Sequence, residues 1–327
     1  MPITSDMKQS PIISSLWNVL TAPSLPPLSL SITESHLVLL ALRHRRGEFE
    51  TRHAALSRLA PGLVNPTFAQ PNIADEDRML DALTRAREQA GLKKIAKINV
   101  SLPAGSARSF VISLDSTPGS RAELAQLIEW KVERATGYKY DELQVSHRRL
   151  HDFQGRPQWM VSAVHRNVLS QYQSLFDRLG WKAGLIVPQH VGEAAWLLRA
   201  ELAEDQMMVS VHDHGFDVVI VRDREPILIR EVECSPVEPE EMDNEFYRLV
   251  IFYRDRLVPA GESASLNRVL IIGSSAEQQR FRDLVSTALE KSTVSLTLPQ
   301  LGLRLDPGLS FPQIAAAAGL SAMAWGK

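Results

Sequence analysis

The sequence predicts a two-domain α/β protein, and three observations lead to that prediction. The chain has 327 residues, a length that suits two domains better than one. Each half contains a β-hairpin around a short polar turn, at residues 28–42 and 207–222, and continues through strands and helices. Hydrophobic residues make up 44% of the chain, which is enough to build mostly apolar sheets covered by helices.

The composition excludes several classes of protein. The net charge is −2 and the isoelectric point is near 6.5, so no overall basic field favours nucleic acid as a partner. The single cysteine, Cys234, allows no internal disulfide and fits a reducing compartment. The longest nearly apolar run, residues 314–325, is too short to cross a bilayer, and the N-terminus lacks the features of a signal peptide. We therefore expect a cytoplasmic protein.

Residues 1–27 are interpreted as a leader. Residues 11–20 predict a short amphipathic helix, and the prolines at 23, 26 and 27 end it because proline lacks the N–H donor. Such a helix either docks on its own domain or contacts a partner or a membrane surface. Only Lys8 lies nearby, so the polybasic face that favours a membrane is absent.

The first domain is predicted over residues 28–190. After the hairpin we expect a strand at 49–59 and a helix at 75–90, which acidic residues open and Gly91 ends. A second helix is predicted at 121–135, with Ser120 as its N-cap and Gly137 as its end. Further strands are expected at 97–102, 107–114, 142–150, 158–165 and 183–187, and a further helix at 167–179.

The second domain is predicted over residues 191–327. It should begin with a helix at 191–202, followed by the second hairpin and a strand at 226–233. Helices are then expected at 239–257, 276–291 and 311–325, and a buried strand at 269–272, ending in a Gly/Ser loop.

The order and spacing of these segments resemble the actin-like ATPase superfamily. More narrowly, they resemble the PilM family of type IV pilus assembly proteins, whose relatives include FtsA and the cytoplasmic part of GspL. The segments that carry the likeness are the hairpin at 28–42, the helix end and strand at 88–103, the helix at 122–133, the strand and helix at 161–180, and residues 252–256 and 269–275. The resemblance implies an actin-like (ribonuclease H-like) two-domain α/β fold, in which residues 97–165 form a small inserted α+β subdomain.

The resemblance also implies where a nucleotide would bind, and there the sequence departs from the family pattern. The first phosphate strand of the family ends in Asp-Ile-Gly, whereas this chain has Ser31, Ile32 and Thr33. Aspartate would hold magnesium-bound water and glycine would let backbone N–H groups approach phosphate. The second phosphate turn corresponds to Asp213 and Gly215, out of register by about two residues in the alignment that the resemblance implies.

The adenosine loop of the family is rich in glycine and corresponds here to Gly273, Ser274 and Ser275. With each element altered, we expect weak or no ATP hydrolysis and assign no catalytic residue and no metal ligand. ATP with magnesium stays open as a cofactor. The first alternative is an active ATPase that uses shifted phosphate turns. In that case Asp213 would bind the metal, and Glu34 or Glu193 would orient water.

The function implied by the resemblance is a cytoplasmic scaffold at the inner-membrane platform of a type IV pilus or related secretion system. Its partner would be the N-terminal cytoplasmic peptide of a PilN-like membrane protein, through which the chain associates with the membrane. Aromatic and apolar residues of the inserted subdomain are the candidates for binding that peptide: Leu127, Trp130, Val132, Tyr138 and Tyr140. The alternative is that they close the core of the subdomain itself, which for Leu127 and Val132 is the preferred interpretation. The second alternative is a GspL-like type II secretion component. A homo-oligomer stays open as well.

Overall fold

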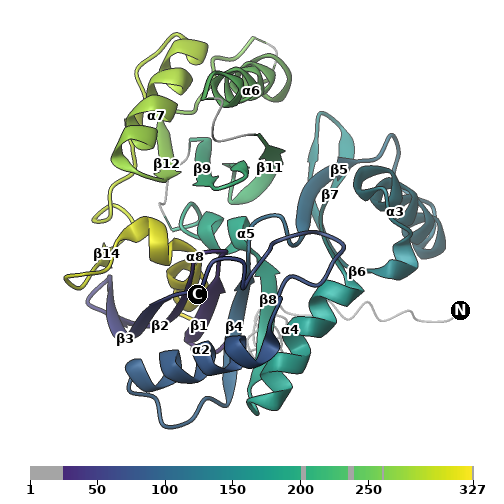
Figure 1. Ribbon diagram of the computed structural model, residues 1–327. Coiled ribbons are helices and arrows are strands. Elements are labelled where there is room, and N and C mark those ends of the chain that lie inside the picture. The colour runs from purple at the N-terminus through teal and green to yellow at the C-terminus, as the bar shows by residue number, and fades with distance from the viewer. Residues whose placement is uncertain (1–24, 200–203, 235–238, 260, 326–327) are drawn as a thin grey trace, which may run out of the picture.

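The computed structural model describes residues 25–199, 204–234, 239–259 and 261–325 (Figure 1). The predicted leader helix at residues 11–20 lies outside the described residues. The sheets that the structure describes have six, five and three strands, and helices cover them, so the protein is of the α/β class.

The six-stranded sheet has the order β14-β3-β2-β1-β4-β8. The first predicted hairpin forms its centre, because β1 pairs with β2 in antiparallel register, Leu28 opposite Ala41 and Ile32 opposite Leu37. Helices α2 and α4 pack on one face of this sheet. The bounds of these elements are β1 Leu28–Ile32, β2 His36–Arg45, β3 Glu48–Arg58, α2 Glu76–Gln89, β4 Lys97–Leu102, α4 Arg166–Arg178, β8 Lys182–Pro188 and β14 Leu303–Arg304.

The five-stranded sheet has the order β11-β10-β9-β12-β13, and helices α6 and α7 cover its outer face. The second predicted hairpin forms β9 and β10, which pair through Gly215 opposite His212. The elements are β9 Gln206–His212, β10 Gly215–Arg222, β11 Glu225–Glu233, α6 Pro239–Phe252, a π-helical turn η2 Tyr253–Leu257, β12 Arg268–Ile272, α7 Ser275–Leu289 and β13 Val294–Ser295.

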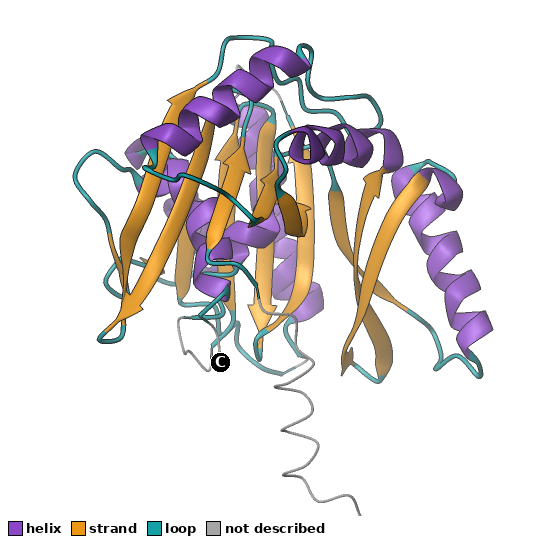
Figure 2. Ribbon diagram, turned by 90° about the horizontal axis from the view of Figure 1, so that it is seen from below, coloured by secondary structure: helices purple, strands orange, loops and turns teal. Residues whose placement is uncertain are grey.

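A small subdomain holds the three-stranded sheet, in the order β5-β7-β6, with one helix packed against it. Figure 2 shows these strands set apart from the large sheet. Ser120 caps the helix by accepting a hydrogen bond from the Glu123 backbone, and Gly137 ends it in a left-handed conformation, both as predicted. The elements are β5 Arg108–Ser113, α3 Arg121–Thr136, a 3₁₀ turn η1 Tyr140–Glu142, β6 Leu143–Phe153 and β7 Arg156–His165.

Two helices lie between the two large sheets, α5 Gln189–Ala194 and α8 Phe311–Met323 (Figure 1). They cross at Gly192 and Gly319, where a Cβ on Gly319 would stand 1.9 Å from the Gly192 carbonyl oxygen. One apolar core joins α8 to residues of both sheets, such as Leu40 of β2 and Met208 of β9. The two halves are therefore packed through a shared layer of helices.

The structure corrects some predicted boundaries. Strand β4 pairs in parallel with β1, so residues 97–102 belong to the six-stranded sheet and the inserted segment begins after them. The physical reason is that Ile98 and Val100 are completely buried in the core between the six-stranded sheet and helices α2 and α4. A central strand provides that environment. At the other end, β14 pairs with β3, and α8 packs on β1 and β2. The C-terminal part of the predicted second domain, with β14 and α8, therefore packs on the first sheet.

The helix expected at residues 191–202 is much shorter than predicted, because α5 ends at Ala194. The chain then turns, and Trp196 is buried in the core between the sheets. Its indole N–H donates to the Ala315 carbonyl oxygen of α8 at 2.9 Å. Packing of Trp196 between the layers thus outweighs the local preference for helix. Residues 200–203 of that prediction lie outside the described part of the chain.

Candidate functional site

The structure brings the two predicted phosphate turns together. Glu34 lies in the turn between β1 and β2, and His214 lies in the turn between β9 and β10. The His214 Nε2 atom is 2.9 Å from the Glu34 Oε2 atom. The two hairpins therefore face each other from different sheets, and an ion pair or a hydrogen bond joins their tips, depending on the protonation of His214.

In the first turn, the candidate residues are occupied by local bonds. The Thr33 hydroxyl accepts from the His36 backbone N–H at 3.1 Å and donates to the His36 carbonyl oxygen at 3.0 Å. The Thr33 backbone N–H also donates to the His36 carbonyl oxygen, at 2.9 Å. Ser31 is buried in the sheet, opposite Val38 on one side and Ser101 on the other. The threonine N–H and hydroxyl thus close their own turn.

In the second turn, Asp213 is exposed and Gly215 is required by the sheet. Gly215 has φ of +138°, and a Cβ there would stand 1.9 Å from the Val232 carbonyl oxygen of β11. The glycine therefore serves close approach of two strands. Asp213 is near enough to favour the charged form of His36, although burial is the larger effect and lowers the pKa of that imidazole.

The third candidate segment, Gly273 to Ser275, leads into α7. Ser274 is the N-cap of that helix, and a capping box links it to Glu277: the Ser274 backbone N–H donates to Glu277 Oε2 at 2.6 Å. The same carboxylate oxygen would be 2.9 Å from a Cβ at Gly273. A negative side chain thus already occupies the positive end of the helix.

These residues do not fit a magnesium nucleotide. The turn N–H of Thr33 is already bonded within the hairpin, and carboxylates stand at the first turn, Glu34, and at the α7 N-terminus, Glu277. Both carboxylates would repel a polyphosphate. Among the described residues, no group of three or more His, Cys, Asp or Glu side chains is arranged to hold a metal ion. We derive no chemical step through a nucleotide.

A buried charged cluster lies beside the second hairpin. Asp217 of β10 is 3.6 Å from His190 Nδ1 of α5 and 3.5 Å from His212 Nε2 of β9. His190 Nδ1 is also 3.8 Å from Glu231 Oε1 of β11. That carboxylate accepts from the Ser109 backbone N–H of β5 at 2.8 Å. The cluster therefore joins α5, the five-stranded sheet and the small subdomain.

The cluster shifts the pKa values of its members. Burial alone would raise the pKa of Asp217, but the neighbouring imidazoles of His190 and His212 outweigh it and lower that pKa to about 2. Burial would lower the pKa of each histidine, yet the neighbouring carboxylates raise both. Burial raises the pKa of Glu231 to about 7. His212, Asp217 and Glu231 also line a hollow of about 830 Å³ under residues 66–70.

His190, Asp217 and Glu231 are not among the site residues predicted from the sequence. A signal was present for Asp217, because a single acid inside an apolar run such as residues 216–221 is expensive to bury without a partner. The identity of its partners depends on helix α5 and strand β9, which only the tertiary fold brings beside it.

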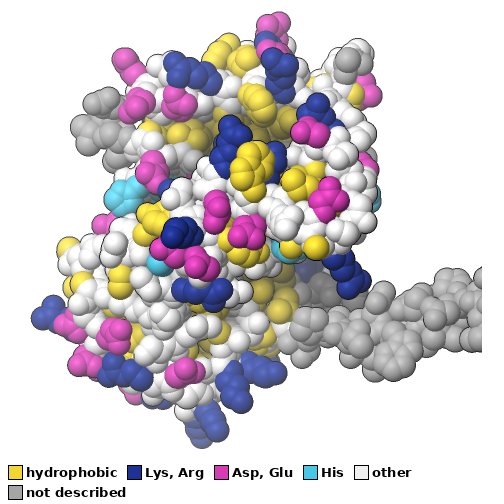
Figure 3. Space-filling view, turned by 90° about the vertical axis from the view of Figure 1, so that its right-hand side faces the viewer, with side chains coloured by type: hydrophobic (Ala, Val, Ile, Leu, Met, Phe, Trp, Pro, Cys, Tyr) yellow, Lys and Arg dark blue, Asp and Glu magenta, His cyan; other side chains and the backbone are white. Residues whose placement is uncertain are grey.

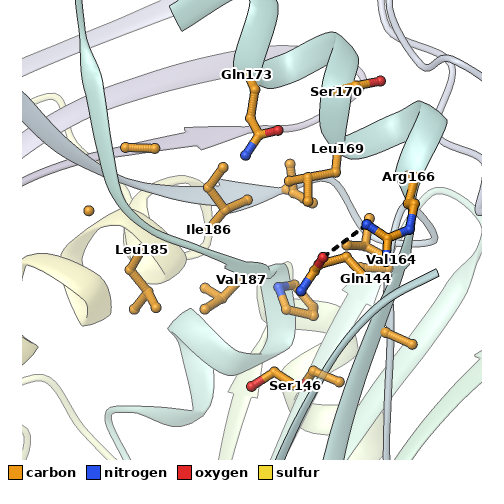
Figure 4. A pocket seen from close by; sticks show the side chains of 17 residues that line it. Gln144, Ser146, Val164, Arg166, Leu169, Ser170, Gln173, Leu185, Ile186 and Val187 are labelled. Carbon is orange, nitrogen blue, oxygen red and sulfur yellow. Dashed lines mark hydrogen bonds between the residues drawn. The ribbon is translucent and has the colours of Figure 1, made fainter. Parts of the chain in front are cut away.

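A groove of about 510 Å³ separates the small subdomain from the large sheet (Figure 4). One wall is β8, the edge strand of the six-stranded sheet, with Leu185, Ile186 and Val187. The opposite walls come from α4 and from β6 and β7, including Leu169 and Gln144. Arg166 Nη1 donates to Gln144 Oε1 at 3.3 Å across one end of the groove. An edge strand beside apolar side chains is the setting in which an extended peptide adds to a sheet.

The five predicted partner-binding residues lie elsewhere. Val132 is completely buried in the core of the small subdomain, and Leu127, Tyr138 and Tyr140 pack against that core. Trp130 is 50% exposed on α3, with Lys131 and Arg134 each 5.5 Å from its ring centroid. None of the five lines the groove beside β8.

In sequence, the chain matches no protein-family model and no curated protein. In structure, it is similar to a chain of the PilM–PilN type IV pilus biogenesis complex. The TM-score is 0.71 over 92% of this chain and 99% of that one, at 16% identity. A protein of actin-like ATPase fold from Bacteroides thetaiotaomicron matches 90% of this chain and 96% of its own, with a TM-score of 0.48 and 11% identity.

The cytoplasmic domain of EpsL, from the type II secretion system of Vibrio cholerae, matches 91% of this chain and 93% of its own, with a TM-score of 0.45 and 12% identity. The chain has the actin-like fold, and within that fold it resembles PilM, as the sequence predicted. No helix in the described part of the chain is long and apolar enough to span a membrane.

Proposed function

We propose that this protein is a scaffold of the inner-membrane assembly platform of a type IV pilus or a related secretion system, with weak or no ATP hydrolysis. The observation that carries the proposal is the structural similarity to a chain of the PilM–PilN complex, which extends over 92% of this chain. The altered turns support the absence of catalysis, since Glu34 and Glu277 stand where a polyphosphate would need positive or neutral donors.

The partner is the N-terminal cytoplasmic peptide of a PilN-like membrane protein, and it brings the scaffold to the membrane. Its binding site is the groove between β8, α4 and the small sheet. Strand β8 pairs only with β4 among the described strands, so its other edge offers backbone groups to an extended peptide. Leu169 and Ile186 offer apolar contacts beside that edge.

Isothermal titration with the synthetic N-terminal peptide of a PilN-like protein encoded beside this one tests the proposal. The wild-type protein should bind it, with or without ATP and magnesium. Leu169→Glu, which places a charge on the apolar wall of the groove, should weaken binding by about tenfold or more, equivalent to about 1.4 kcal/mol. Absence of binding by the wild type under any nucleotide condition would contradict the proposal.

Trp130→Ala is the matched control. Trp130 does not line the groove, so this variant should bind the peptide as the wild type does. Loss of binding in Trp130→Ala with retention in Leu169→Glu would assign the peptide site to α3, as predicted from the sequence.

A further inference from the structure

A second groove, separate from the first, lies between the small subdomain and the five-stranded sheet. Its volume is about 690 Å³, and its walls are β5 and β11, with α3 and the turn η2 at its margins. Both β5 and β11 are edge strands of their sheets. They are linked at one end, where the Ser109 backbone N–H donates to Glu231 and Arg108 lies 4.0 Å from Glu233. The groove lies beyond this link, along residues 110–113 and 227–230.

The groove is strongly basic. It is lined by five positively charged residues and by no aspartate or glutamate, although the whole chain has a net charge of −2. The five are Lys131, Arg134, Arg156, Arg230 and Arg256. Among the described residues, Arg156 is the one of the five that forms an ion pair, with Asp115 at 3.9 Å. The other four cations have no carboxylate oxygen within 4.0 Å in the part of the chain that the structure describes.

Apolar side chains lie among these cations. Phe252, which lines the groove, is 43% exposed, and Trp130 stands beside Lys131 and Arg134 at its margin. Figure 3, which looks onto the side that carries the small subdomain, shows dark blue and yellow side chains gathered together. Exposed aromatic residues next to unpaired arginines are typical of the centre of a protein interface.

At one end the groove reaches the turn after β6, at Phe153 and Gln154. Two acidic residues of the neighbouring strand ends are already paired: Glu225 of β11 with His151 at 2.9 Å, and Asp152 of β6 with Arg149.

We propose that this groove binds an acidic peptide segment of a partner protein in extended conformation. Its backbone would pair with the free edge of β5 or β11, its carboxylates would pair with Arg230, Arg256 and Arg134, and its apolar side chains would contact Phe252. Charge complementarity selects this occupant, and two adjacent free strand edges favour an extended backbone. Such a segment would link the small subdomain to the second half of the molecule.

Fluorescence anisotropy tests the proposal with a short fluorescein-labelled peptide in which glutamate alternates with leucine. The full-length wild-type protein should bind this peptide at low salt, and binding should weaken as salt is added. The same peptide with glutamine in place of glutamate should bind at least about tenfold more weakly. Equal binding of the two peptides, or no binding of either, would overturn the proposal.

Charge reversal locates the site. The double variant Arg230→Glu and Arg256→Glu should lose the acidic peptide and gain affinity for a peptide with lysine in place of glutamate. Arg85→Glu is the matched control, because Arg85 is an exposed arginine on α2 outside the groove. Equal weakening by the control would overturn the proposal. A third outcome would assign the groove to a membrane surface instead. In that outcome the wild-type protein binds phosphatidylglycerol vesicles but not the peptide, and the double variant does not bind the vesicles.

Discussion

Glu34 and His214 are 180 residues apart in the chain, and their side chains meet at 2.9 Å. Each belongs to the turn of a hairpin in a different sheet, so this contact joins the tips of the two hairpins. Both side chains are more than a third exposed, and a pair of this kind contributes at most about 1 kcal/mol to stability. Its main effect is to hold the Glu34 carboxylate between the two turns.

Removal of the two blocking carboxylates should change nucleotide affinity. We expect no ATP–magnesium binding by the wild type below the millimolar range in isothermal titration, because Glu34 and Glu277 repel the polyphosphate. The double variant Glu34→Gln and Glu277→Gln should bind more tightly than the wild type. Submillimolar binding by the wild type, together with ATP hydrolysis, would favour an active ATPase.

The buried cluster makes stability depend on pH in a defined direction. Glu231, Glu193, His190 and His212 have raised pKa values in the folded state, so the native protein holds more protons than the unfolded chain. The free energy of unfolding should therefore fall as pH rises. For Glu231 the fall begins at about pH 4.5 and is complete above its folded pKa of about 7. For the two histidines the fall begins at about pH 6.5 and is complete above their raised pKa values. Each proton contributes a slope of about 1.4 kcal/mol per pH unit.

Asp217 acts in the opposite direction at lower pH. Its pKa is lowered to about 2, so its stabilising effect is complete above the unfolded value of 3.8 and is lost as pH falls toward 2. Urea unfolding at several pH values measures both limbs. Glu231→Gln should flatten the slope between pH 4.5 and 7, whereas the exposed Glu129→Gln should leave it unchanged; an unchanged slope in Glu231→Gln would contradict the assignment.

A methyl group at Gly215 should destabilise the second hairpin. In Gly215→Ala the new Cβ would meet the Val232 carbonyl oxygen at 1.9 Å, and φ is +138°. We expect a loss of about 3 kcal/mol or more, since strand separation adds to backbone strain of about 1–3 kcal/mol. Gly62→Ala is the control, because its φ is also positive, +75°, but no atom lies within 4 Å of the added Cβ. Thermal unfolding of the two variants should therefore differ clearly; equal losses would show that strain alone matters.

Two neighbouring positions on α3 should respond differently to truncation. Val132 is completely buried, so Val132→Ala should cost about 1–3 kcal/mol through lost burial and a cavity. Trp130 is half exposed, and Trp130→Ala should change the free energy of unfolding by less than about 1 kcal/mol. Chemical denaturation compares them. A larger loss in Trp130→Ala would show that its contacts with Lys131 and Arg134 hold the helix.

Local chemistry explains which elements the sequence predicted. Alternating and apolar runs located both hairpins, and cap residues such as Asp75 and Ser120 located helix starts, because these signals act over a few residues. The same reasoning gave too long a helix after residue 191, where burial of Trp196 against α8 decides the backbone.

The site was less predictable than the fold. The sequence identified the altered turns at Ser31, Thr33 and Gly273 by their departure from a pattern. It did not reveal the contact of Glu34 with His214, or the gathering of His190, Asp217 and Glu231, because each depends on how distant segments pack. The grooves beside β8 and β11 likewise arise between elements, and no single segment encodes them.

The return of α8 to the first sheet has a consequence for protein synthesis. The hydroxyl of Ser321 accepts from the Leu42 backbone N–H at 2.8 Å, and α8 buries the face of β1 and β2 that looks toward the other sheet. Chains emerge from the ribosome N-terminus first. The apolar side chains of β2 that α8 covers, Val38, Leu40 and Leu42, therefore stay exposed until the last helix has been translated. A chaperone would have an apolar strand to bind during that period.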